Sequence, residues 1–149
     1  MPDPQEESVA IVDPVVSNLK RWSDHVSFQL VIKSRWAWKA NCYELSPKAM
    51  YPPTEAGQIA VAAGVCGGCP VKKQCLMLSL MSRETYGVWG ATTESERGEL
   101  LKMVDEVFDP KEFTDSSCLK PISDVVDSWL DYQSTISDAN YELVRVKEI

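Results

Sequence analysis

The 149-residue chain contains no run of about 18 apolar residues, so no segment is long and apolar enough to span a membrane. Its first residues, MPDPQEESVA, also lack the basic region and the apolar core of a secretory signal. Together these two absences predict a protein of the reducing cytoplasm. In that compartment structural disulfides are rare, which weakens a disulfide interpretation of the five cysteines.

Signals of catalysis are also missing. His25 is the only histidine, and without a companion for acid–base chemistry we assign it a structural role. The acidic residues form no recognisable general acid/base pair, and the sequence has no glycine-rich phosphate-binding loop. We therefore expect no enzymatic activity.

Positive charge is scarce as well. The formal net charge is −7, and residues 102–149 alone hold eleven acids and five bases. A surface that binds duplex DNA normally shows clustered Lys and Arg. Outside the acidic tail, the modest positive charges of the central region include Lys72, Lys73 and Arg83. We expect DNA contact to be weak or indirect.

No alternating strand pattern of useful length and no internal repeat occurs, so the chain is expected to be all-α. Thr54 is a candidate N-cap, Pro70 suits a helix start, and Gly87 a helix end. Thr93 and Glu96 match a capping box. These signals, with Ser123 as a last cap, predict helices over about 55–63, 70–86, 94–107 and 124–133. Frequent apolar residues predict a further helix over about 15–33. The apolar stripe of the last helix either stays on a solvated face or docks on the body or a partner.

Cysteine is concentrated in one stretch, CGGCPVKKQC, which spans Cys66–Cys75. Counted from Cys42 the spacing is C-x23-C-x2-C-x5-C, and the two glycines permit a tight turn between Cys66 and Cys69. Four thiolates converging from a loop, a turn and a helix suit either tetrahedral zinc or an iron–sulfur cluster. A redox-active CxxC is less favoured, because thioredoxin-type motifs follow a strand. Cys118 lies outside the spacing and is expected to be an ordinary surface or half-buried thiol.

These residues, followed by GVWGATTESER, resemble the WhiB-like (Wbl) proteins of actinobacteria and their viruses. The similarity runs from about Trp38 to Leu101 and includes Tyr51-Pro52. The resemblance implies a small helical fold around a [4Fe-4S] cluster, bound by Cys42, Cys66, Cys69 and Cys75. It also implies a transcription factor that binds the C-terminal domain of the principal sigma factor of RNA polymerase. In that family the cluster reacts with oxygen or nitric oxide.

The resemblance further implies a partner-binding surface, formed by Gly87, Val88, Trp89, Gly90, Tyr51 and Trp38. The competing interpretation of Trp89 is a plug over the core. Trp38 and Tyr51 flank Cys42 and are expected to shield the cluster as well as join this surface, and for them the competing interpretation is core packing. The sequence departs from the family pattern at Ala91, where a second glycine is usual, and in its acidic tail. The acidic tail leaves open that the protein inhibits or diverts sigma. Two different functions also fit the cysteines: a zinc-stabilised adaptor, and a metal-free disulfide reductase that uses Cys66 and Cys69.

We accordingly expect three segments: a flexible stretch at 1–14, a cluster-binding helical domain at 15–108, and an acidic extension with one helix at 109–149.

Overall fold

The computed structural model describes residues 14–147, with side chains for 15–135. Within this range the fold is all-α, as predicted, and contains no strand. The helices are α2 (Pro14–Trp36), α3 (Glu55–Gly64), α4 (Lys72–Met81), α5 (Glu94–Val107) and α6 (Lys120–Lys147). Short 3-10 turns separate them: η1 (Ala37–Lys39), η2 (Pro47–Met50), η3 (Pro110–Glu112) and η4 (Ser116–Leu119). No helix among the described residues combines the length and apolar character needed to cross a membrane. The expected flexible stretch at 1–14 lies, except for its last residue, outside the described range.

Two helices follow their predicted caps closely. The Thr54 side chain accepts a hydrogen bond from the backbone N–H of Gly57 and opens α3. Thr93 and Glu96 form the reciprocal capping box that opens α5. Side-chain oxygens accept hydrogen bonds from N–H groups that have no partner at the start of a helix. The starts of α3 and α5 can therefore be predicted from the sequence.

The predicted end of α4 at Gly87 is wrong, because the helix stops at Met81. Arg83 adopts a left-handed conformation, with φ 55°. The N–H of Glu84 then bonds to the carbonyl of Ser79, and that of Arg83 to the carbonyl of Leu80. This is a Schellman closure with arginine where glycine is usual, so the usual sequence signal is missing.

The predicted start of α6 at Ser123 is also wrong. Asp115 caps η4 by accepting a hydrogen bond from the N–H of Ser117, and η4 leads directly into α6 at Lys120. Ser123 therefore lies inside the helix. The helix also runs on to Lys147, well past the predicted end at 133. Similarly α2 is longer than predicted and reaches Trp36.

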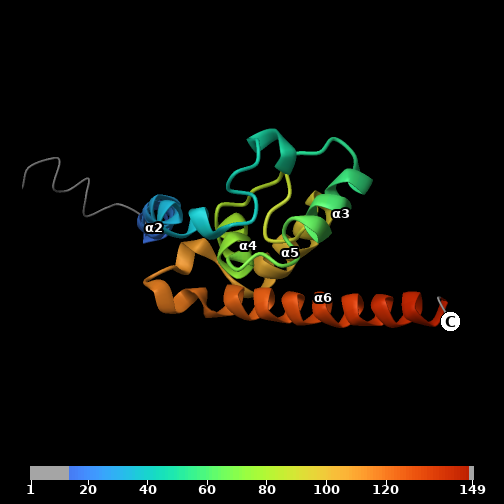
Figure 1. Cartoon of the computed structure of the whole chain (residues 1–149). Coiled ribbons are helices and arrows are strands. Elements are labelled where there is room, and N and C mark those ends of the chain that lie inside the picture. Colours follow the sequence, from blue (N-terminus) through green and yellow to red (C-terminus); the bar gives the residue numbers. More distant parts are fainter. Residues whose placement is uncertain (1–13, 148–149) are drawn as a thin grey trace, which may run out of the picture.

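The main core lies between α4, α5 and α6, where Leu76, Leu100, Ile122 and Val126 are at most 1% exposed. Figure 1 shows α6 running along the lower side of the body beneath α4 and α5 and continuing beyond them. The apolar stripe of α6 thus docks on the body rather than remaining solvated. On the other side, α2 packs on η3, where Trp22 contacts the rings of Phe108 and Phe113.

Candidate metal centre

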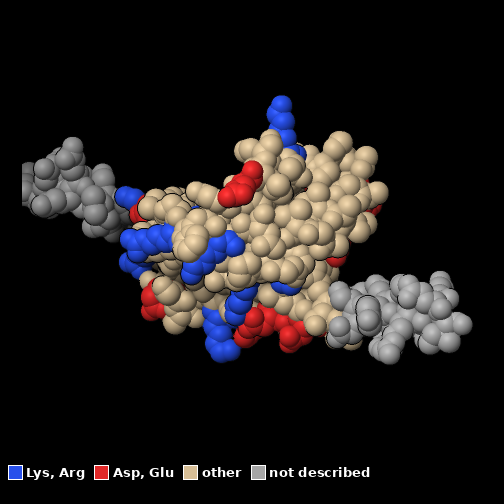
Figure 2. Space-filling model, in the orientation of Figure 1, with Lys and Arg blue, Asp and Glu red and all other residues tan. Residues whose placement is uncertain are grey.

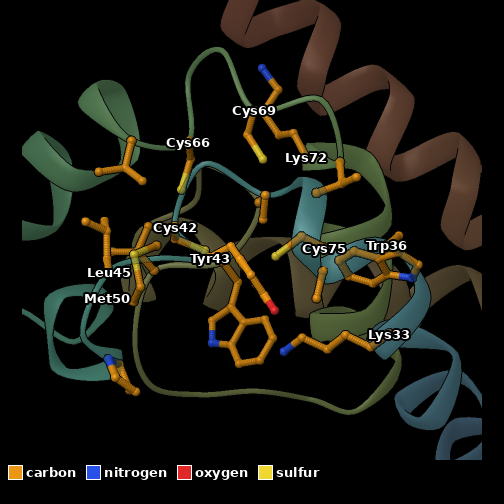
Figure 3. A pocket seen from close by; sticks show the side chains of 18 of the residues that line it. Lys33, Trp36, Cys42, Tyr43, Leu45, Met50, Cys66, Cys69, Lys72 and Cys75 are labelled. Carbon is orange, nitrogen blue, oxygen red and sulfur yellow. The ribbon is translucent and has the colours of Figure 1, made fainter.

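The four cysteines of the predicted motif line one cavity of about 290 Å³. Cys42 comes from the loop after η1, Cys66 and Cys69 from the turn between α3 and α4, and Cys75 from α4 itself. Figure 3 shows their sulfur atoms around a common space. Cys118 is on the η4 turn, away from this cavity.

Among the described residues, the wall of the cavity contains no carboxylate, and its charged members are Lys33 and Lys72. The remaining wall is largely apolar or aromatic and includes Trp36, Tyr43 and Met50. As the side chains stand, no group of three or more Cys, His, Asp or Glu in the described part of the chain is arranged to hold a single metal ion. The donor set is therefore four thiols with two nearby cations.

Burial dominates the chemistry of two thiols. It raises the pKa of Cys75 to about 12, partly opposed by a hydrogen bond from the N–H of Gly90 and by the charge of Lys33. Burial also raises the pKa of Cys66, against a hydrogen bond from the N–H of Ala91. A catalytic CxxC thiol needs a lowered pKa. The direction at Cys66 disfavours the disulfide-reductase interpretation, whereas a bound metal ion would displace both protons.

The turn after α4 explains two of the glycines. Gly87 and Gly90 have φ values of 81° and 52°. A Cβ atom on Gly87 would stand 2.5 Å from the ring of Tyr51, and one on Gly90 would stand 2.7 Å from the backbone nitrogen of Leu76. The turn is closed by mutual backbone hydrogen bonds between Trp89 and Thr92.

This turn is attached to the cysteine cavity. The N–H groups of Gly90 and Ala91 donate to the sulfurs of Cys75 and Cys66, respectively. Val88 is buried, and its N–H donates to the carbonyl of Met50 in a 2.7 Å hydrogen bond. The conformation of the turn therefore depends directly on where the two sulfurs lie.

Trp89 is half-buried and belongs to neither buried core cluster, so it is not a simple plug over the core. Its indole N–H donates to the carbonyl of Tyr86, at 3.0 Å. The ammonium of Lys33 lies 4.4 Å from the centre of a Trp89 ring, within cation–π range. Trp89 also borders the cysteine cavity, so one side chain joins the cavity to the protein surface.

The two other predicted aromatics differ from each other. Tyr51 borders the cavity and covers Gly87, while 49% of its surface stays exposed. Trp38 is absent from the cavity wall, is 59% exposed, and donates through its indole N–H to the carbonyl of Arg35. The expectation that Trp38 shields the cavity is therefore wrong, because its ring lies outside the wall and Trp36 takes that place.

Sequence reasoning missed Arg97, which is fully buried beneath the turn. Its guanidinium donates to the carbonyls of Glu84 and Gly87, each at 2.6 Å, and to that of Thr92, at 3.4 Å. Burial lowers the pKa of Arg97, opposed by the charges of Glu94 and Glu84. Its only signal in the sequence is a basic residue on the apolar side of a capped helix.

Surface charge is unevenly distributed. Lys73 and Arg83, two of the predicted positives, are ion-paired with Asp127 and Asp105 at 2.7 and 2.6 Å. The ammonium of Lys72 donates to the carbonyl of Gly67. Figure 2 shows Lys and Arg gathered at the end of the molecule where α2 lies, and acidic groups along its lower edge.

Comparison with known proteins matches the segment of the chain that forms this site. The family profile described as transcription factor WhiB matches residues 36–100, which include the four cysteines and the turn. The transcriptional regulators WhiB1 and WhiB2 of Mycobacterium tuberculosis are 39% and 35% identical to this chain over 71 and 68 residues. These matches cover 84% and 75% of the relatives and 45% and 46% of this chain. WhiB of Streptomyces coelicolor is 34% identical over 67 residues, which is 76% of that protein and 45% of this chain. The chain belongs to the WhiB family of transcription factors.

Proposed function

We propose that this chain is a [4Fe-4S]-containing transcription regulator that binds the C-terminal domain of the principal sigma factor. In this proposal the cluster holds the partner-binding turn in shape. The observation that carries it is the pair of hydrogen bonds from Gly90 and Ala91 to the sulfurs of Cys75 and Cys66. Trp89, the proposed anchor, directly precedes these two residues.

The donor set fits a cluster. Cys42, Cys66, Cys69 and Cys75 would bind it, and four thiolates are the ligands that [4Fe-4S] clusters use. The cavity of about 290 Å³ compares with about 30 Å³ for one water molecule, so it suits a group of several atoms. Lys33 and Lys72 would offset the negative charge of the thiolates, with no carboxylate competing. When bound, the cluster supplies a centre that exchanges electrons and reacts with oxygen or nitric oxide.

The chain's residues would couple cluster and partner through folding. In small metal sites the energy of metal binding is largely folding energy. Loss of the cluster would leave the side chains of Cys66 and Cys75 free to move. Their sulfurs would then no longer hold the N–H groups of the turn in place. The backbone around Trp89 would then lose two of its restraints, and the partner surface would lose its shape.

The proposed contact centres on Trp89. A tryptophan on a glycine-framed turn buries a large area when it enters an apolar pocket, and such anchors dominate binding energy. Truncation of an anchor typically costs about 2 kcal/mol or more, which is roughly a 30-fold loss of affinity. Tyr51 supports the turn from one side by covering Gly87.

The first test is the cofactor itself. Protein purified without oxygen is expected to show the broad visible absorption of an iron–sulfur cluster, with iron and sulfide in equal amounts. Serine at Cys42, Cys66, Cys69 or Cys75 is expected to abolish retention, while Cys118→Ser retains the cluster. Zinc without sulfide in the wild type would favour the zinc-stabilised adaptor. Insulin reduction by the metal-free protein, lost in Cys66→Ser, would favour the reductase.

The second test is the partner. The purified sigma domain is captured on the cluster-loaded protein, with Trp89→Ala compared against Phe28→Ala, an exposed aromatic of α2. We expect about 30-fold weaker capture for Trp89→Ala and little change for Phe28→Ala. Undiminished capture by Trp89→Ala would remove the anchor. A salt series on duplex DNA accompanies it, and we expect weak binding because Lys73 and Arg83 are already paired.

A further inference from the structure

Helix α6 lies outside the segment that matches the family, yet it reaches the partner-binding turn. The side-chain amide of Gln133 donates to the carbonyl of Ala91, with 2.9 Å between nitrogen and oxygen. The two residues are 42 positions apart, and the contact is partly buried. It is therefore a tertiary contact between α6 and the turn that borders the cysteine cavity.

Ala91 is an unusual residue for this position. Its φ is 64°, in the left-handed region, which is unfavourable for a residue that carries a Cβ atom. It is also buried, in a small apolar cluster with Ala62, Cys66 and Val88. A strained backbone conformation of this kind persists only where surrounding contacts hold it.

Both peptide groups that flank Ala91 are held. Its N–H donates to the sulfur of Cys66, and its carbonyl accepts from Gln133. The N–H lies in the peptide plane before the Cα atom of Ala91, and the carbonyl lies in the peptide plane after it. Fixing both planes fixes the two backbone dihedrals of Ala91, and with them the direction in which its N–H points.

Gln133 is itself held by a well-anchored helix. Ile122 and Val126 of α6 are fully buried in the main core, and Asp127 pairs with Lys73 of α4 at 2.7 Å. Gln133 follows about two helical turns later, so its position is set by the rigid element and not by a mobile loop.

We propose that Gln133 is a positioning residue of the metal centre, which keeps the N–H of Ala91 on the sulfur of Cys66 and so makes α6 a determinant of cluster potential. Hydrogen bonds to ligand sulfurs stabilise the more electron-rich state of a cluster and raise its reduction potential. The assignment of the group as an iron–sulfur cluster rests on the proposed function above. The role of Gln133 in positioning the N–H of Ala91 against the sulfur of Cys66 does not depend on that assignment.

The experiment compares Gln133→Met with Gln74→Met, which replaces an exposed glutamine of α4 by the same side chain. In the cluster-loaded protein we expect Gln133→Met to shift the midpoint potential to a more negative value. We also expect two- to tenfold faster iron loss, as fits one net hydrogen bond of about 0.5–1.5 kcal/mol. Gln74→Met is expected to match the wild type in both measurements. An unchanged potential in Gln133→Met would overturn the proposal even if the variant were less stable.

A second arm separates this role from ordinary packing. Ala91→Gly relieves the left-handed strain, so Gln133→Met is expected to have a smaller effect on iron loss in that background. Equal effects in both backgrounds would contradict the role of Gln133 in holding Ala91.

A third arm covers failure of the proposed function. If the wild type binds no iron–sulfur cluster, the protein is loaded with Co²⁺. Gln133→Met, and not Gln74→Met, is then expected to move the thiolate-to-cobalt absorption to longer wavelength. Identical bands in the two variants would refute the positioning role independently of the cluster.

Discussion

Replacing Arg97 with methionine tests how the turn from Gly87 to Ala91, the proposed partner surface, is held. Arg97 is fully buried, and no carboxylate of the described residues lies within ion-pair distance of its guanidinium. Instead the guanidinium bonds to backbone carbonyls, those of Glu84 and Gly87 at 2.6 Å and that of Thr92 at 3.4 Å. Methionine keeps much of the apolar stem and removes every donor. The variant thus isolates the hydrogen bonds.

The magnitude follows from the two short bonds. A hydrogen bond to a charged group contributes about 1.5–3 kcal/mol, so the pair contributes about 3–6 kcal/mol. Removing a buried cation returns part of its desolvation cost, which the lowered pKa of Arg97 reflects. We expect a net loss of about 3 kcal/mol in the free energy of unfolding. That is a large share of the roughly 5–15 kcal/mol typical of a domain.

The assay is guanidinium unfolding without oxygen, followed by far-ultraviolet circular dichroism and by the visible absorption of the cofactor. Arg83→Met is the matched control, because Arg83 is exposed and its ion pair with Asp105 contributes only about 0–1 kcal/mol. Arg97→Lys keeps the charge but not the planar fork and is expected to recover little. An Arg97→Met protein within about 1 kcal/mol of Arg83→Met would refute the reasoning.

Three further outcomes are expected. Lys33→Met removes a cation–π contact of about 0.5–1 kcal/mol and should weaken sigma capture two- to fivefold, measured beside Lys39→Met, whose contact is with Trp38. Burial lowers the pKa of His25, so its contribution to stability is full above about pH 6.5 and is lost as pH falls through the folded-state pKa. His25→Phe should flatten that part of a plot of unfolding free energy against pH. Cys118, whose pKa is lowered by hydrogen bonds from the backbone of Asp115 and from Thr114, should react with iodoacetamide before Cys75 does.

Much of the fold was predictable because its signals are local. Thr54 and the Thr93–Glu96 pair satisfy free N–H groups within one helical turn, so the starts of α3 and α5 follow from short sequence patterns. The four cysteines were predictable for a related reason. Their spacing and the glycines between them are local features, and the fold brings all four to one cavity.

The errors arise where tertiary contacts override local signals. The end of α4 depends on Arg83 in a left-handed conformation, and its guanidinium is bound by Asp105 of another helix. The start of α6 depends on Asp115, which precedes the expected cap by eight residues. Lys33 and Gln133 were not identified because each meets the turn from a helix distant in sequence. Residue spacing in the sequence does not predict contacts between such distant segments.

These contacts imply that the turn is shaped from outside. Three of the five residues from Gly87 to Ala91 have positive φ, and the turn's own closure is the backbone pairing of Trp89 with Thr92. Its other contacts come from Arg97 on α5, from Gln133 on α6, from the carbonyl of Met50, and from the sulfurs of Cys66 and Cys75. Cluster loss would remove the sulfur contacts and leave those of the two helices. The affinity of the proposed partner surface for the sigma domain should then fall in proportion to the number of restraints removed. A double loss, of the cluster and of Gln133, should abolish sigma capture where either alone reduces it.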